Sequence, residues 1–156
     1  MDANGFKNLC QFVAARIPNA DTKISENAFE LSINGVEISL FFNPLITSDR
    51  IDCYVDIGNA PDHGREEVFS RLLSMNLLSG TKTSGVYGFD LESEKIIFSQ
   101  QIIYPDLMDP DELATLLAEY GAHAKSLQQV FLNPQSTSPL SSGLIDSFQT
   151  NSSFLA

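Results

Sequence analysis

The sequence predicts an α+β fold in which a twisted antiparallel sheet is flanked by helices. Three segments carry apolar residues at helical spacing, four carry them at every second position, and a fifth strand-like segment is apolar on both sides. An Asn-Gly pair joins two of the alternating segments. The expected order is α-β-β-β-α-β-β-α. The 156 residues suit one domain, placed at residues 1–131, and a hydrophobic content of 43% is enough for its core.

The first helix is predicted from Asp2 or Asn4 to Ile17. Pro18 ends it, because proline disfavours helical geometry at the residue before it. Phe12 lies off the apolar stripe and is a candidate contact for a partner. The stripe consists of Phe6, Leu9, Cys10, Val13 and Ile17.

A β-hairpin follows at residues 29–42. Apolar and polar residues alternate on both sides of Asn34-Gly35, a dipeptide that accepts the positive φ angles of a two-residue turn. The turn sets Ile33 opposite Val36, so the two apolar rows share one face. Phe41 falls on the polar face, where it either binds a partner or is covered by a neighbouring helix.

Three more strands are predicted, at residues 51–57, 87–91 and 96–103. The first has Tyr54 on its polar side. The last is apolar on both sides, so we expect it to be central in the sheet or partly covered on both faces.

The central helix begins near Arg65, and its apolar residues cover more than half of its circumference. Such a helix is either deeply buried in a large protein or shared with a partner. A chain of this length leaves little protein to bury the second face, so we expect a homodimer through this helix. The apolar residues are Val68, Phe69, Leu72, Leu73, Met75, Leu77 and Leu78.

The last helix begins after Asp109, the expected N-cap, with Pro110 at its first position and Glu112 completing a capping box. Its apolar face extends to Phe131. Residues 132–156 contain seven serines, two prolines and one charged residue, which predicts a flexible tail. Scattered leucines and phenylalanines leave open that the tail docks on the domain.

The net charge of −11 argues against nucleic acid and anionic membranes as partners. It would favour a basic or amphipathic partner, or it serves simply to keep the protein solvated. No apolar run is long enough to span a membrane, and the N-terminus lacks the pattern of a secretory signal. Cys10 and Cys53 fit the core as small side chains, so a reducing cytoplasm suits this chain.

Catalytic, cofactor and metal sites are not expected. His63 and His123 have no second histidine or cysteine at the spacing that metal ligands need. The Asp62-His63 pair could suggest a catalytic site, but two neighbours in a glycine-flanked loop are more often solvated turn residues. Residues 80–83 resemble a phosphate loop, but they follow a helix instead of preceding one. We therefore expect a protein that is not an enzyme.

Several local strings resemble the class I chaperones of bacterial type III secretion, the Tir-chaperone (CesT-type) family, over residues 4–131. Two departures are the absence of tryptophan near the end of the last helix and the longer tail. The strings are Val55-Asp56-Ile57-Gly58 with Pro61, Leu72-Leu73-Ser74-Met75-Asn76, Gly85-Val86-Tyr87-Gly88-Phe89-Asp90 and Ile96-Ile97-Phe98.

The resemblance implies a cytoplasmic, non-enzymatic, homodimeric chaperone. It would hold a segment near the N-terminus of one or more effectors extended and ready for secretion, with the secretion ATPase or sorting platform as a further partner. The implied dimer interface is Phe69, Leu72, Leu73, Met75, Asn76, Leu78 and Tyr87. The implied effector contacts, on apolar grooves and an open sheet edge, are Phe12, Phe29, Leu31, Phe41 and Tyr54.

Two other functions stay open. A small α+β adaptor or regulatory module would share the fold class but bind a folded partner. An enzyme would need folding to bring His63 or His123 together with acidic residues in a pocket.

Overall fold

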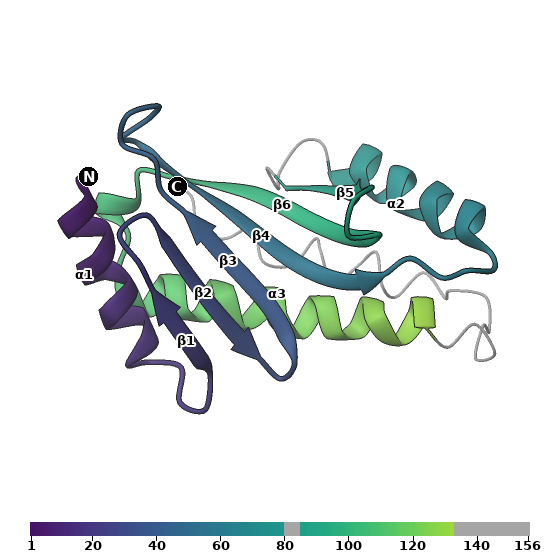
Figure 1. Cartoon of the computed structure of the whole chain (residues 1–156), viewed down its shortest axis with the longest axis horizontal. Coiled ribbons are helices and arrows are strands. Elements are labelled where there is room, and N and C mark those ends of the chain that lie inside the picture. Colours follow the sequence, from purple (N-terminus) through teal and green to yellow (C-terminus); the bar gives the residue numbers. More distant parts are fainter. Residues whose placement is uncertain (80–84, 133–156) are drawn as a thin grey trace.

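The computed structural model describes residues 1–79 and 85–132. Its six strands form one antiparallel sheet in the order β1-β2-β3-β4-β6-β5 (Figure 1). The α+β class and the antiparallel sheet flanked by helices are confirmed, with one strand more than predicted. The elements are α1 (Ala3–Ala14), β1 (Asp21–Ile24), β2 (Ala28–Ile33), β3 (Val36–Phe41), β4 (Arg50–Asn59), α2 (Arg65–Ser79), β5 (Val86–Asp90), β6 (Lys95–Ile103), the 3-10 turn η1 (Pro105–Leu107) and α3 (Pro110–Leu132).

The three α-helices of the described residues pack on the same face of the sheet, which we call the inner face. Phe6 of α1 stacks on Phe42 with ring centroids 5.4 Å apart. Tyr120 of α3 meets Phe98 at 5.6 Å, and α2 contributes Phe69, which lies 5.0 Å from the ring of Phe89. The cross-strand register places the three sheet-side rings on one side, so the core lies between this face and the helices.

The opposite, outer face is not covered by any helix of the described residues. Phe41 lies on this face with 44% of its surface exposed, so the alternative of a covering helix does not hold within the described chain. The outward side chains of the four inner strands are exposed or half-buried, and they include Glu30, Ser32, Glu37, Ser39, Phe41, Asp52, Tyr54, Asp56, Ile97, Ser99, Gln101 and Ile103.

Strand β1 and the end of α1 differ from the prediction. β1 is a polar edge strand, three of whose four residues are exposed, so it lacks the apolar alternation that marks the other strands. Helix α1 ends at Ala14 and not at Ile17, because the N–H of Arg16 donates to the carbonyl of Val13 at 3.0 Å and tightens the last turn.

Several local predictions are confirmed. Asn34 and Gly35 have φ angles of 54° and 78°, and β6 lies between β4 and β5. The N–H of Asp111 donates to Oδ1 of Asp109 at 2.8 Å, as expected for an N-cap. Cys10 and Cys53 are buried, and burial raises the pKa of both thiols to about 12.

Two parts of the sequence prediction lie outside the described residues. These are the loop at residues 80–83 and nearly all of the expected tail, residues 133–156.

Candidate protein-binding surfaces

Helix α2 presents apolar side chains on two sides. Val68 and Leu72 face the sheet, with 8% and 5% of their surfaces exposed. Leu73, Leu77 and Leu78 face away from it and are 68%, 83% and 69% exposed. We call these three residues the outer leucines of α2. Their exposure fits a helix that is shared with a partner.

The residues of the expected dimer interface differ in how far they are exposed on the single subunit. Leu72 is buried within its own subunit, because it lies on the side of α2 that meets the sheet. Phe69 and Met75 are half-buried against the same core. Leu77 of α2 and Val86 of β5 are also exposed, although neither was in the expected set. Leu77 follows Leu73 by four residues, a helical spacing that could have pointed to it.

Asn76 and Tyr87, also expected at that interface, have partners within the subunit. The side-chain amide of Asn76 donates to the carbonyl of Tyr87 at 2.9 Å and accepts from its N–H at 2.7 Å. The Tyr87 hydroxyl lies 2.5 Å from Nε2 of His123. Burial raises the pKa of Tyr87 and lowers that of His123. Tyr87 therefore joins β5 to both α2 and α3.

Phe41 and Tyr54 form an aromatic pair on the outer face of the sheet. Their ring centroids are 5.8 Å apart in an edge-on arrangement, and Tyr54 is 40% exposed. Phe41 lies opposite Asp52, and Tyr54 lies opposite Ser39. The fold thus brings together two residues that the sequence placed on separate strands.

Phe29 and Leu31 were expected to contact an effector, and the fold places both on the inner face. Both are buried, at 0% and 1% exposure, because they lie on the inner face beneath the helices. The alternation of β2 shows that these side chains share a face, but the same pattern would arise whichever face the helices cover.

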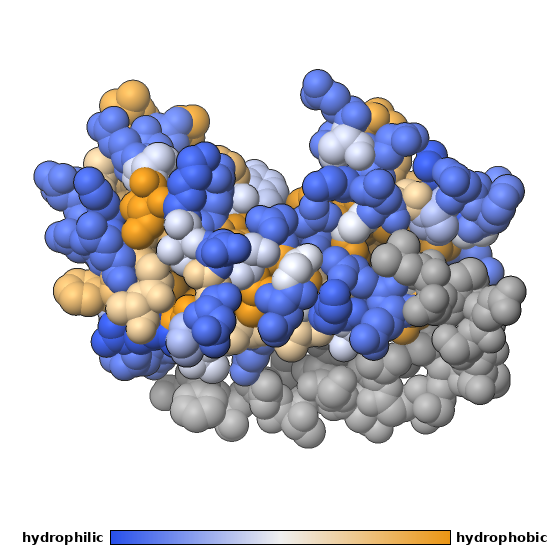
Figure 2. Space-filling view, turned by 60° about the horizontal axis from the view of Figure 1, so that its bottom comes forward, coloured by the Kyte–Doolittle hydropathy of each residue, from blue (hydrophilic) through white to orange (hydrophobic). Residues whose placement is uncertain are grey.

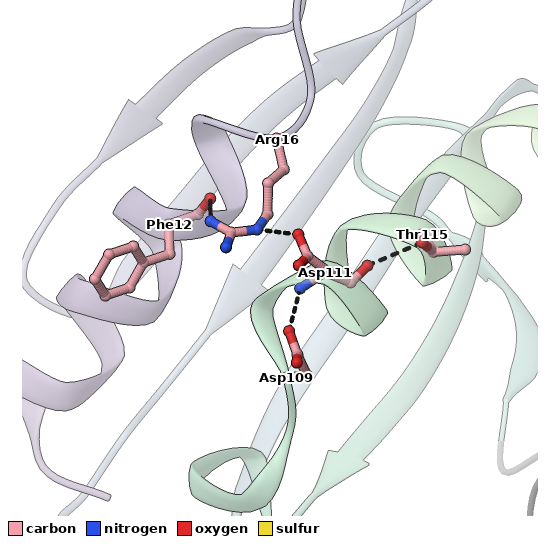
Figure 3. A network of polar contacts seen from close by, with 5 residues as sticks. All are labelled: Phe12, Arg16, Asp109, Asp111 and Thr115. Carbon is pink, nitrogen blue, oxygen red and sulfur yellow. Dashed lines mark hydrogen bonds and ion pairs between the residues drawn. The ribbon is translucent and has the colours of Figure 1, made fainter.

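Phe12 is exposed, but it lies on α1 and therefore on the helix-covered side of the sheet, away from Phe41. Figure 3 shows Arg16 between this residue and α3: its guanidinium donates to the Phe12 carbonyl at 3.0 Å and forms an ion pair with Asp111. The Phe12 ring points away from α3 in this view, with its centroid 6.0 Å from the guanidinium carbon.

Residues 20–128 match the Tir chaperone protein (CesT) family. The chain belongs to this family. Its fold is similar to a chain in the ExsC-ExsE complex, with a TM-score of 0.67 and 20% identity, covering 84% of this chain and 97% of that one. It is also similar to a chain in the HopA1-SchA chaperone-effector complex, with a TM-score of 0.60 and 12% identity over 81% and 95% of the two chains. No curated protein sequence matches.

This CesT-family protein has a further apolar surface that the sequence did not single out. Leu45 and Ile46 of the β3–β4 loop are 95% and 72% exposed, and Leu107 of η1 is 82% exposed. The N–H of Tyr104 donates to the carbonyl of Asp49 at 2.6 Å, which holds the loop near η1. Figure 2 shows apolar residues at the surface of this end of the molecule, on the left.

Within the described residues, the acidic, histidine and cysteine side chains form no group of three that could hold a metal ion. Asp62 and His63 are both exposed in the loop before α2. None of the described helices is long and apolar enough to cross a membrane.

Proposed function

We propose that this CesT-family protein is a cytoplasmic, non-enzymatic chaperone of type III secretion. It binds an extended segment near the N-terminus of one or more effectors and keeps that segment ready for secretion. The observation that carries the proposal is the uncovered outer face with its aromatic pair, Phe41 and Tyr54, in a chain of a chaperone family. The similar HopA1-SchA structure, a chaperone-effector complex, supports it.

The proposed chaperone is a homodimer joined through α2 and the neighbouring strand β5. Fully burying a leucine side chain stabilises a protein by roughly 1.5–3 kcal/mol, and each subunit offers three outer leucines together with Val86. A two-fold axis would bury the same apolar patch of both copies at once. The secretion ATPase or sorting platform is the proposed further partner.

The extended effector segment also has a free sheet edge to pair with. The β5 edge is occupied at Tyr87 by the side chain of Asn76. At the other end of the sheet, β1 pairs with β2 alone among the described strands. Addition of a strand to β1 would satisfy main-chain groups that otherwise bond to water.

The test is binding of N-terminal segments of secreted proteins from the same organism, measured against the purified chain. We expect Phe41→Glu to weaken binding and to leave the dimer intact, because the side chain lies on the outer face and away from α2. Leu91→Glu is the matched control, since Leu91 is 84% exposed in the β5–β6 turn.

Unchanged binding by Phe41→Glu would contradict the role of the outer face. Binding of folded partner domains alone, with no affinity for extended segments, would favour the adaptor function instead.

A further inference from the structure

The outer face carries an excess of negative charge. Lys23 pairs with Glu30 at 3.1 Å, and Lys95 pairs with Asp56 at 2.5 Å. Glu37 lies on the same face and has no ion-pair partner among the described residues. Arg50, two residues before Asp52 on β4, also lies on this face. Glu37 and Asp52 form no ion pair with a described residue, so negative charge is left over even with Arg50 counted.

Acidic and aromatic side chains alternate along β4. Asp52, Tyr54 and Asp56 occupy successive outward positions, about 6.6 Å apart given the rise of a strand. Asp52 forms no ion pair with any described residue and accepts one hydrogen bond, from Gln101 at 3.3 Å. Phe41 lies opposite Asp52 and packs against Tyr54, so carboxylates stand on both sides of the aromatic pair.

A shallow pocket of about 320 Å³ continues the outer face toward β1. Its walls contain three carboxylates and one lysine, which suits a cationic side chain. Ser39 and Ser99 lie on either side of Tyr54 in the neighbouring strands. Because their side chains are short, the Tyr54 ring projects above the surface around it. The pocket is lined by Asp21, Thr22, Lys23, Glu30, Ser32 and Glu37.

From this arrangement we propose that the outer face selects an extended segment in which lysine or arginine residues flank an apolar residue. The apolar side chain contacts Phe41 and Tyr54, one basic residue pairs with Asp52, and another reaches Glu37 and the pocket. These residues stand two apart in the segment, because an extended chain turns every second side chain to the same side.

The inference rests on the proposed function, since it names the chemistry of the segment that the chaperone holds. The net charge of −11 agrees with a basic partner. A second copy of the same face is a poor occupant, because like charges placed opposite one another repel.

Fluorescence anisotropy with two labelled synthetic peptides and the full chain tests the proposal. In the first peptide, arginine and leucine alternate at every second position with serine between them. In the second, glutamate replaces each arginine. We expect the first peptide alone to bind, with an affinity that falls as salt is added. Equal binding of both peptides, or no binding of the first, would overturn the proposal.

Variants that neutralise pairs of carboxylates show where on the protein the arginine peptide binds. Glu37→Gln combined with Asp52→Asn should weaken binding of the arginine peptide by up to about fivefold for each carboxylate removed, as expected for exposed ion pairs. Asp62→Asn combined with Glu119→Gln removes the same charge away from the outer face and should leave the affinity unchanged. Equal weakening by both pairs would show a general charge effect and refute a site on the sheet.

The same variants, tested with an effector segment, separate this inference from the proposed function. If the Glu37 and Asp52 variant binds the effector segment as the wild type does while Phe41→Glu does not, the charge proposal fails and the chaperone function stands. If no effector segment binds the wild type, the proposed function fails, whatever the synthetic peptide does.

Discussion

At the scale of single residues, Tyr87 is the residue on which three elements converge. Its backbone pairs with the amide of Asn76, its hydroxyl meets His123, and its ring lies 5.0 Å from that of Phe98. Each contact joins a different element to β5, so removal of one partner should loosen the attachment of that element. Two predictions follow from the partners of Tyr87.

Asn76→Ala should lower the free energy of unfolding by about 1–3 kcal/mol, because it leaves the N–H and the carbonyl of Tyr87 without their partner. Hydrogen exchange of the β5 amides should become faster in this variant. Asn8→Ala, an exposed asparagine on α1, is the control for chemical denaturation. Unchanged exchange at Tyr87 would contradict the role assigned to Asn76.

The protein should lose stability as the pH falls below about 6.5, in part through His123. Burial lowers the pKa of this histidine from 6.5, so the folded protein binds the proton less tightly than the unfolded chain. The stabilising effect is therefore complete above the unfolded pKa and declines below it. Urea unfolding at pH about 7.5 and about 5.5 measures the difference.

His123→Gln should flatten this pH dependence, whereas His63→Gln, a change to an exposed histidine, should leave it as in the wild type. Equal pH dependence of the wild type and His123→Gln would exclude His123 as its source.

At the scale of elements, α2 divides its apolar residues between the core and the solvent. Leu72 and Leu73 are neighbours in sequence, yet the first is buried and the second is exposed. They point about 100° apart on the helix, so only the packing of α2 on the sheet decides which one faces the core. Substitutions at the two positions should therefore have different effects.

Leu73→Asp combined with Leu77→Asp should give folded monomers, because both side chains face away from the core and a charge there opposes burial against a second copy. Light scattering gives the mass, and circular dichroism verifies the fold. A dimer of wild-type mass would contradict the proposed interface.

Leu72→Ala should instead destabilise the subunit by about 2–5 kcal/mol, as expected for a truncated core leucine. This variant should have a lower denaturation midpoint, while its mass in light scattering should still be that of the wild type.

The sequence predicted most elements but could not decide which surfaces stay open. The hairpin, the apolar strand β6 and the N-cap Asp109 each carry a local signal that depends on a few neighbouring residues. Strand β1 was missed because its polar residues need no apolar face at the edge. Phe29 and Phe41 were both proposed as effector contacts, since alternation does not reveal which face the helices cover.

At the scale of the whole molecule, the described residues fold into one unit of six strands and three α-helices, with these helices on one side of the sheet. The remaining side is the acidic outer face with its aromatic pair. This division lets the core form on one side of the sheet while the other keeps side chains available to a partner.

Removal of residues 133–156 should leave the proposed dimer intact, because α3 stays whole to Leu132 and the outer leucines belong to α2. Light scattering of both forms should give about twice the mass of one chain, which is 17.1 kDa for the full sequence. A monomer after truncation would place part of the interface in the removed residues.

The pairing of Asn76 with Tyr87 has a consequence for how copies of this protein can aggregate. Open-ended fibres of stacked sheets need two adhesive edges on every copy, so that each addition exposes the next. Here the side-chain amide already occupies the main-chain groups of Tyr87 at one end. Strand pairing at the β5 end is therefore opposed at Tyr87, which leaves β1 as the edge where a further strand can pair. The occupied groups at Tyr87 thus reduce the number of strand edges through which each copy could stack into a fibre.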